Sequence, residues 1–396
     1  MNDNMIYTSS HTYDLDLLNN ANISINLNES NNDNLLNFKV KDYNYNNELY
    51  KFVKYDKSKL NNDNINSYGL CRSIVFKNDK IICVSPPKSY PYDLFNSLYD
   101  NKECVAEEYV EGTMINLFYD SSKEEWEIST KSTIGGKVAY FNNEKLLNFR
   151  EMFLETCNEC NFEFDILDKN LTYTFVLQHP NNRIVIPFIE KRLYLVACYK
   201  IKNDNLTYDA IDTNSVKYLF NDINIHYPKQ YKFNSYSELI DINNNLDMYS
   251  CVGIMIHHHS SGSRSKLRNT KYEHIRKLRG NQPKLQYRYL ELRISHDISE
   301  YLCYYPEHTN YFKSYEQEII AYMSMLYDYY VACFIYKQNV LKNYPYEYKE
   351  NMYILHGKYK TILKKKQQKI TKKYVIDHVN SLHPSQIMFV INYKKR

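Results

Sequence analysis

The most informative run in the chain is Phe175-Val176-Leu177-Gln178-His179-Pro180-Asn181-Asn182-Arg183-Ile184-Val185. It contains two stretches of β-branched, aromatic and aliphatic residues, separated by a short Pro-Asn-Asn segment. Such stretches between turn residues are typical of strands. We therefore predict strands over Leu171–Gln178 and Arg183–Phe188, followed by a third over Leu193–Tyr199.

Similar patterns extend outward from this run on both sides. Helical spacing of apolar residues appears over 144–160, and again beyond about Leu285 in Phe312–Tyr336 and Glu350–Lys369. The sequence thus predicts an α+β fold, with an antiparallel-sheet domain followed by an all-helical one. The other predicted strands are Ser73–Phe76 and Lys80–Val84 around the Asn78-Asp79 turn, Val105–Val110 and Met114–Tyr119 around Glu111-Gly112, Trp126–Thr130, and Cys251–His257.

Three segments follow from these patterns and from composition. Residues 1–66 hold 18 Asn and few apolar runs, so we expect a loosely packed Asn-rich extension over 1–45, with some strand near Asn37–Tyr55. The sheet domain is expected over 46–284 and the helical domain over 285–396.

Composition narrows the classes of protein that this chain can belong to. It has 396 residues, of which 43% are hydrophobic and 24% charged, so wholesale disorder and a pure coiled coil are excluded. Its abundant Asn, Lys, Ile and Tyr are favoured by AT-rich codons, a bias typical of large DNA viruses and some protozoa. We interpret the skew as genome bias and expect a large DNA virus as the source.

Charge is distributed unevenly along the chain. Residues 263–396 carry 25 Lys and Arg against 11 Asp and Glu, a net charge of +14, whereas the remainder is acidic. A basic half favours a polyanionic partner, and basic residues with interleaved tyrosines are typical of nucleic-acid binding. The alternative is a solvated connector and exposed helix surface. Residues of the basic strip expected to contact nucleic acid are Lys271, Arg276, Lys277, Arg279 and Lys284.

The sequence predicts neither a membrane-spanning segment nor a metal-binding site. No apolar run approaches the ~18–20 residues of a membrane span, and the N-terminus lacks the pattern of a signal peptide. The nine Cys are scattered, and the pair Cys157 and Cys160 has no second pair at zinc spacing. We expect reduced thiols, no metal, and a location in the host cytoplasm (a viral factory) or in the virion.

Six short segments, in order, resemble motifs of the phage-type RNA ligases, members of the covalent nucleotidyltransferase superfamily that also contains DNA ligases and capping enzymes. The resemblance spans about half the chain, from Tyr68 to Lys277. The segments are Gly69-Leu70-Cys71-Arg72-Ser73-Ile74-Val75-Phe76, Glu107-Glu108-Tyr109-Val110-Glu111-Gly112-Thr113, Ile128-Ser129-Thr130-Lys131-Ser132-Thr133-Ile134-Gly135, the run 175–185 quoted above, Val252-Gly253-Ile254-Met255-Ile256, and Lys266-Leu267-Arg268-Asn269-Thr270-Lys271-Tyr272.

The resemblance also exposes departures at the positions that carry the chemistry. It implies a Lys nucleophile that forms a phosphoramidate with a nucleotide, yet Tyr109 stands at that position. Val176 and Val252 stand where the family has carboxylates, and Arg268 replaces the second Lys of a Lys-x-Lys pair. Either the motif alignment is displaced by a residue or two, or the chain has kept the fold and lost lysyl-nucleotide chemistry.

By resemblance, the nucleotide or phosphate ligands are Arg72, Glu111, Lys131, Arg183, Lys266 and Arg268. Three functions stay open. The first is a catalytically degenerate ligase-like protein that binds nucleic acid, RNA more than DNA, and that has viral protein partners. The second is an active RNA ligase with a relocated nucleophile, for which ATP and Mg²⁺ would be the cofactors. The third is a structural virion protein without a nucleic-acid role.

Overall fold

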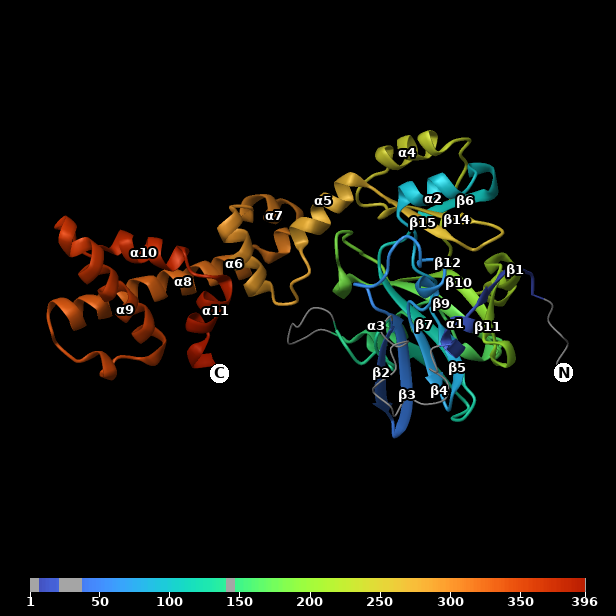
Figure 1. The fold of residues 1–396 in the computed structure, drawn as a ribbon, viewed down its shortest axis with the longest axis horizontal. Coiled ribbons are helices and arrows are strands. Elements are labelled where there is room, and N and C mark those ends of the chain that lie inside the picture. Colours follow the sequence, from blue (N-terminus) through green and yellow to red (C-terminus); the bar gives the residue numbers. More distant parts are fainter. Residues whose placement is uncertain (1–6, 21–37, 140–146, 396) are drawn as a thin grey trace. The chain divides into compact units, whose positions relative to one another are not determined.

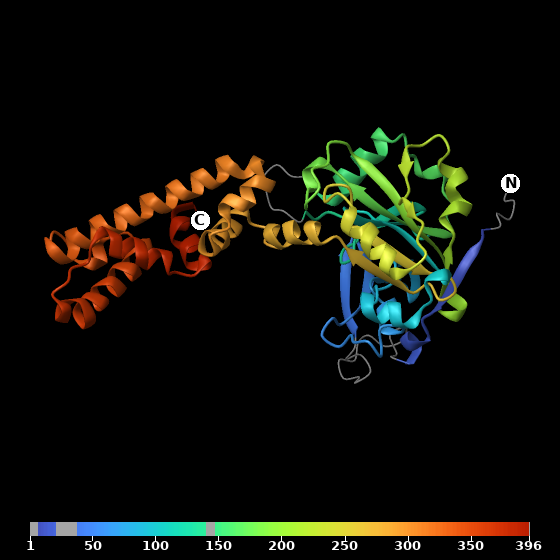
Figure 2. The same ribbon diagram turned by 90° about the horizontal axis from the view of Figure 1, so that it is seen from above.

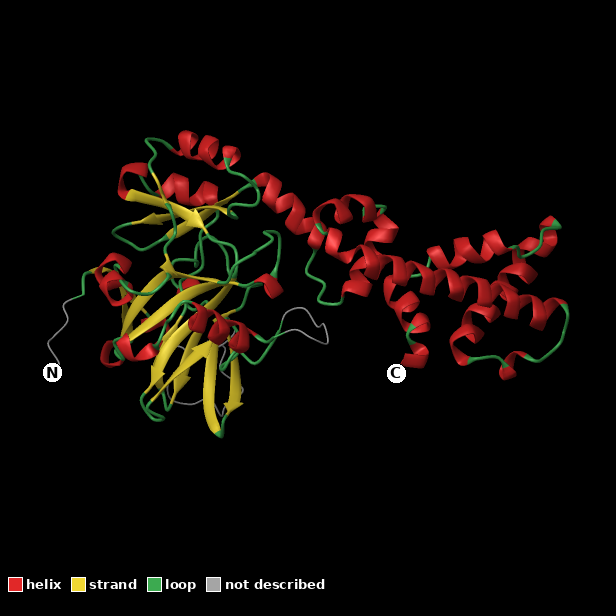
Figure 3. Cartoon of the chain, turned by 180° about the vertical axis from the view of Figure 1, so that it is seen from behind, coloured by secondary structure: helices red, strands yellow, loops and turns green. Residues whose placement is uncertain are grey.

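The computed structural model describes residues 7–20, 38–139 and 147–395. The chain divides into two compact units, Met1–Arg276 (unit 1) and Lys277–Arg396 (unit 2), and the division falls within α5 (Thr270–Arg279). The sequence had placed this boundary a little later, at 284/285. The strands lie in unit 1, and unit 2 is helical (Figures 1 and 3).

The largest sheet of unit 1 has the strand order β1-β11-β10-β9-β7-β8, with the short β12 beside β10. All its pairs are antiparallel except β10 with β12. Every residue of β9 is buried, which fits its uninterrupted apolar and Thr-rich sequence. Its strands are β1 (Ser9–Asp14), β7 (Thr113–Asp120), β8 (Glu125–Ser129), β9 (Leu171–Gln178), β10 (Arg192–Lys202), β11 (Thr207–Ile211) and β12 (Ile225–His226).

Two smaller antiparallel sheets complete unit 1. One has the order β13-β6-β14-β15, and the other β2-β3-β4-β5. In the second, Asn78 and Asp79 both have positive φ, as a tight hairpin between β4 and β5 requires. The strands are β2 (Phe38–Tyr45), β3 (Glu48–Tyr55), β4 (Ile74–Lys77), β5 (Lys80–Val84), β6 (Cys104–Tyr109), β13 (Gln230–Tyr231), β14 (Gly253–His258) and β15 (Arg264–Arg268).

The segment Glu111-Gly112 connects two sheets instead of closing a hairpin. The predicted strands on either side of it exist as β6 and β7, but β6 pairs with β14 and β7 pairs with β9. Gly112 has a φ of 153°, and a Cβ atom there would collide with the Leu177 carbonyl and the Val176 side chain. Glycine at this position therefore lets the chain cross closely over β9.

Part of the expected N-terminal extension belongs to the sheets. β1 pairs with β11, and β2 pairs with β3, in agreement with the strand expected near 37–55. Leu15 and Leu18, beside and within α1 (Asp16–Asn20), are buried in a core with residues of β4 and β5. Residues 1–6 and 21–37 of the extension lie outside the described residues.

Helices of unit 1 flank its sheets (Figure 2). The helix predicted over 144–160 is α3 (Phe149–Glu159), and it begins at a capping box formed by Asn148 and Glu151. The part of that prediction over 140–146 lies outside the described residues. Unit 1 also contains α2 (Tyr92–Leu98) and α4 (Tyr236–Asn245), besides α1 and most of α5.

Unit 2 is built around α8 (Thr309–Tyr330), which continues as a π-helical turn over Val331–Ile335. Its buried face holds Tyr322, Met323 and Leu326 among others, as the predicted apolar stripe requires. No helix within the described ranges is long and apolar enough to cross a membrane. The remaining helices are α6 (Leu285–Ser295), α7 (Ile298–Tyr304), α9 (Tyr346–Lys358), α10 (Lys372–Asn380) and α11 (Pro384–Ile391).

Candidate functional site

A pocket of about 430 Å³ in unit 1 collects basic side chains from segments far apart in the sequence. Its walls include residues of β6, β14 and β15 from one sheet and of β7, β9 and β10 from another. The predicted residues Arg72, Lys131 and Lys266 all line it. The full set of cationic lining residues is Lys57, Arg72, Lys88, Lys131, Arg264 and Lys266.

These six cations lack carboxylate partners. Over residues 7–20, 38–139 and 147–395, none of them has a carboxylate oxygen within the 4.0 Å of an ion pair. Lys88 Nζ donates instead to the Ser89 carbonyl at 2.8 Å, and Arg264 Nε donates to the Pro87 carbonyl at 2.8 Å. By contrast, the buried Lys77 pairs with Asp120 at 2.8 Å. The pocket therefore holds cations that no ion pair within the described residues neutralises, whereas a buried lysine elsewhere in unit 1 is paired with a carboxylate.

Burial and mutual repulsion perturb the titration of this cluster. Desolvation, followed by the neighbouring cations, lowers the pKa of Lys88 and that of Lys266 to about 8 each. The same causes lower the pKa of Lys131 and bring that of Arg72 to about 10. An anion in the pocket would relieve the repulsion and favour the protonated lysines.

The pocket lining also includes apolar side chains. Val176 packs with Val110 and Tyr194, and Met114 and Met255 also line the cavity. A pocket lined by both cationic and apolar side chains matches a ligand with a phosphate group and a flat, weakly polar ring.

Two carboxylates, Glu107 and Glu108, also line the pocket, and both have partners. Glu107 Oε1 lies 2.8 Å from His257 Nε2. Glu108 accepts a hydrogen bond from the Lys229 backbone N–H at 3.2 Å, and burial raises its pKa. The His257–Glu107 pair was not foreseen, because its members lie 150 residues apart on β14 and β6.

Tyr109, Val176 and Val252, which depart from the motifs of the resembled ligases, have different surroundings. Tyr109, at the nucleophile position, lines the pocket together with Lys266. Val176 lines it as well. Val252 is buried, is absent from the pocket lining, and donates its backbone N–H to the Tyr109 carbonyl at 2.9 Å.

Glu111 is not part of the pocket lining, and its carboxylate accepts hydrogen bonds from backbone amides of the protein. Its carboxylate accepts backbone hydrogen bonds from Ile184 at 3.3 Å, Val185 at 3.0 Å and Ile186 at 3.1 Å, and it also bonds the Tyr272 side chain. Burial raises its pKa, and these hydrogen bonds oppose that shift. The strand predicted over Arg183–Phe188 is therefore wrong: this segment is irregular, and its amides bond the Glu111 carboxylate instead of a neighbouring strand.

The other predicted ligands also have protein partners. Arg183 Nε donates to the Val185 carbonyl at 3.0 Å, and Arg268 is 3.3 Å from Glu273. Neither lines the pocket.

The predicted nucleic-acid contacts of the basic strip differ in exposure. Lys271, Lys277 and Lys284 are exposed. Arg276 pairs with Glu273 on the same helix at 2.5 Å. Arg279 is only 6% exposed, with its guanidinium over the Tyr305 ring, so it is badly placed to contact a phosphate in solvent. Sequence spacing does not reveal this difference, because α5 presents its basic residues on more than one side.

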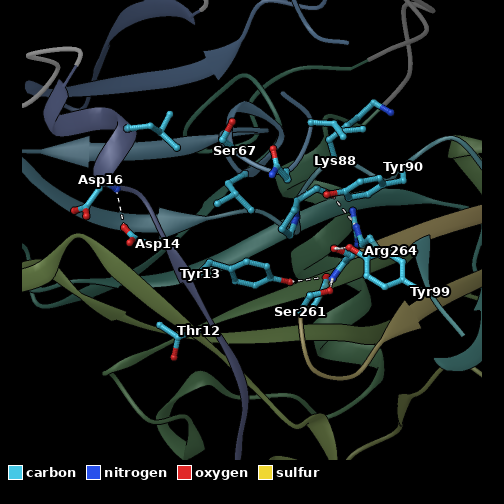
Figure 4. A pocket seen from close by; sticks show the side chains of 17 residues that line it. Thr12, Tyr13, Asp14, Asp16, Ser67, Lys88, Tyr90, Tyr99, Ser261 and Arg264 are labelled. Atoms are coloured by element: carbon cyan, nitrogen blue, oxygen red, sulfur yellow. Dashed lines mark hydrogen bonds between the residues drawn. The ribbon is translucent and has the colours of Figure 1, made fainter. Parts of the chain in front are cut away.

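A second cavity, of about 540 Å³, shares Lys88 and Arg264 with the first (Figure 4). Its lining also contains Asp14 and Asp16, together with the hydroxyls of Ser67 and Ser261. Its two carboxylates match its two cations, whereas the first pocket has six cations and two carboxylates.

No family model matches the sequence. The chain is 22% identical over 242 residues to the "Immediate-early protein ICP-46 homolog" of Invertebrate iridescent virus 3, an alignment that covers 57% of the chain and 49% of that protein. The chain thus spans about half the length of the curated relative it matches.

Among solved structures, the chain is similar to proteins named as RNA or DNA ligases. An archaeal ATP-dependent RNA ligase aligns over 70% of this chain and 68% of its own, with 15% identity and a TM-score of 0.35. A Naegleria gruberi RNA ligase mutant with AMP and Mn aligns over 60% and 77%, with 9% identity and a TM-score of 0.35. A putative ATP-dependent DNA ligase from Aquifex aeolicus aligns over 90% and 78%, with 11% identity and a TM-score of 0.35. The chain is an α+β protein with a helical C-terminal unit, as its sequence predicts.

Proposed function

We propose that this chain is a ligase-like protein that binds nucleic-acid ends, RNA in preference to DNA, and that it holds their phosphates non-covalently in the basic pocket. The observation that carries the proposal is the group of six cationic side chains in one pocket without a carboxylate partner. Lysine and arginine bind phosphate through charge-assisted hydrogen bonds. The apolar side chains Val110 and Val176 of the pocket supply a surface for a base or ribose.

The reason for proposing non-covalent binding is that Tyr109 stands at the position of the lysine nucleophile. A phenol has no nitrogen, so it cannot form the phosphoramidate through which the resembled ligases act. Tyr109 lines the pocket beside Lys266, where the amine would be needed.

A second candidate function, an active nucleotidyltransferase with a relocated nucleophile, is favoured by one observation. Lys88 and Lys266 both line the pocket, and both have a pKa near 8, so a fraction of each amine is neutral and nucleophilic near neutral pH. In this alternative ATP is a substrate, and retention of label after denaturation distinguishes it from simple binding.

Lys271 in unit 1, and separately Lys277 and Lys284 in unit 2, are exposed and are proposed as further contacts to nucleic acid. Each would attract the phosphate backbone without reading its sequence. By the same proposal, the protein acts with viral partners in the host cytoplasm or in the virion.

Titration of a 5′-phosphorylated single-stranded RNA against salt tests the proposal. We expect the logarithm of the association constant to fall with the logarithm of salt concentration, with a slope of about −0.7 for each phosphate contact. The same RNA with a 5′-hydroxyl end is the control, and it should bind more weakly because it lacks the terminal phosphate. Absence of binding at low salt would instead support a structural protein without a nucleic-acid role.

A further inference from the structure

The resemblance to ligases implies Mg²⁺ beside the nucleotide, so the donors available in the pocket decide whether the ion fits. Mg²⁺ prefers carboxylate, phosphate and water oxygens in octahedral geometry. At the two positions where the resemblance implies carboxylates, Val176 packs in an apolar cluster and Val252 is buried. Neither side chain has an oxygen to offer.

The two carboxylates that do line the pocket already have hydrogen-bond partners. Glu107 bonds His257, and Glu108 bonds the backbone of Lys229. Within the part of the chain that the structure describes, no group of three His, Cys, Asp or Glu side chains is arranged to hold a metal ion. The residues of the pocket therefore do not fit the metal that the resemblance implies.

The cationic side chains offer a different way to neutralise phosphate. Arg72, Lys131 and Lys266 come from three different segments, and with Lys57, Lys88 and Arg264 they give the pocket six basic side chains. Electrostatic repulsion from these groups disfavours a divalent cation, whereas each of them can donate directly to a phosphate oxygen.

We infer that the pocket takes its phosphate ligand in the metal-free form, with lysine and arginine side chains supplying the neutralisation that Mg²⁺ supplies in metal-dependent sites. This inference rests on the proposed function, because it presupposes that the pocket binds phosphate. The ligand class is a nucleotide or nucleic-acid end with a free, fully charged phosphate group.

Calorimetric titration of the full chain with ATP, once in EDTA and once in excess MgCl₂, tests the inference. We expect ATP to bind at least as tightly in EDTA, because Mg²⁺ lowers the negative charge of the ligand that the cations attract. Weakening by roughly tenfold or more in EDTA would overturn the inference while leaving the proposed function intact. No binding in either condition would overturn both.

A pair of variants at Val176 provides a second test. Val176→Glu adds a carboxylate to the pocket, and Val176→Gln adds a side chain of similar size without the charge. Val176→Glu should bind ATP more weakly than Val176→Gln in EDTA, and MgCl₂ should reduce that difference. Thermal unfolding of both variants controls for folding. Equal affinities for the two folded variants in EDTA would contradict the role assigned to charge.

Discussion

Replacement of Lys266 by alanine should weaken the binding of ATP or 5′-phosphorylated RNA by roughly 10- to 100-fold. Lys266 lines the basic pocket, and no carboxylate in the described ranges forms an ion pair with its ammonium group. A hydrogen bond to a charged group contributes about 1.5–3 kcal/mol, and each 1.4 kcal/mol changes affinity about tenfold. Fluorescence anisotropy with labelled RNA measures the effect.

Lys80→Ala is the matched control for this variant. Lys80 is an exposed lysine of the same unit at the start of β5, and it is not part of the pocket lining. Its replacement removes the same charge from the protein, so it should change affinity little. Equal losses for both variants would mean that net charge, and not the pocket, determines binding.

Replacement of Glu111 by alanine should lower the free energy of unfolding by about 3 kcal/mol or more. Its buried carboxylate accepts hydrogen bonds from the amides of Val185 and Ile186 and bonds Tyr272. Each buried polar group left without a partner costs about 1–3 kcal/mol. Urea unfolding monitored by circular dichroism measures the loss.

Two further variants make the result specific. Glu111→Gln keeps one acceptor oxygen and should lose less stability than Glu111→Ala. Glu125→Ala removes an exposed glutamate at the start of β8 and should be nearly neutral. If Glu111→Ala instead unfolds like the parent protein but loses phosphate affinity, the residue acts on the ligand and its structural assignment is wrong.

The sequence predicted where strands and helices lie better than it predicted which distant segments pair with one another. Strands β4, β5 and β9 and helix α8 match periodic patterns, because local burial determines which residues repeat. The segment Arg183–Phe188 has an equally strong strand pattern, yet it is irregular. Its backbone amides are satisfied by Glu111, some 73–75 residues earlier in the sequence, and no local signal contains that information.

The sequence predicted residues of the pocket only where they belong to a motif of the resembled family. Arg72, Lys131 and Lys266 were identified by resemblance, and all three line the pocket. Lys57 lies outside every motif and reaches the pocket through the path of the chain after β3. The burial of Arg279 could not be predicted, because a run of basic residues does not reveal which of them is buried.

The central claim is that the pocket binds a phosphate ligand without forming a covalent bond to it. Incubation with α-labelled ATP, divided between native filter binding and a denaturing gel, tests both parts in one measurement. The account predicts label on the native protein and none after denaturation. Label that survives denaturation would contradict it and identify a relocated nucleophile, and absence of label from the native protein would contradict binding itself.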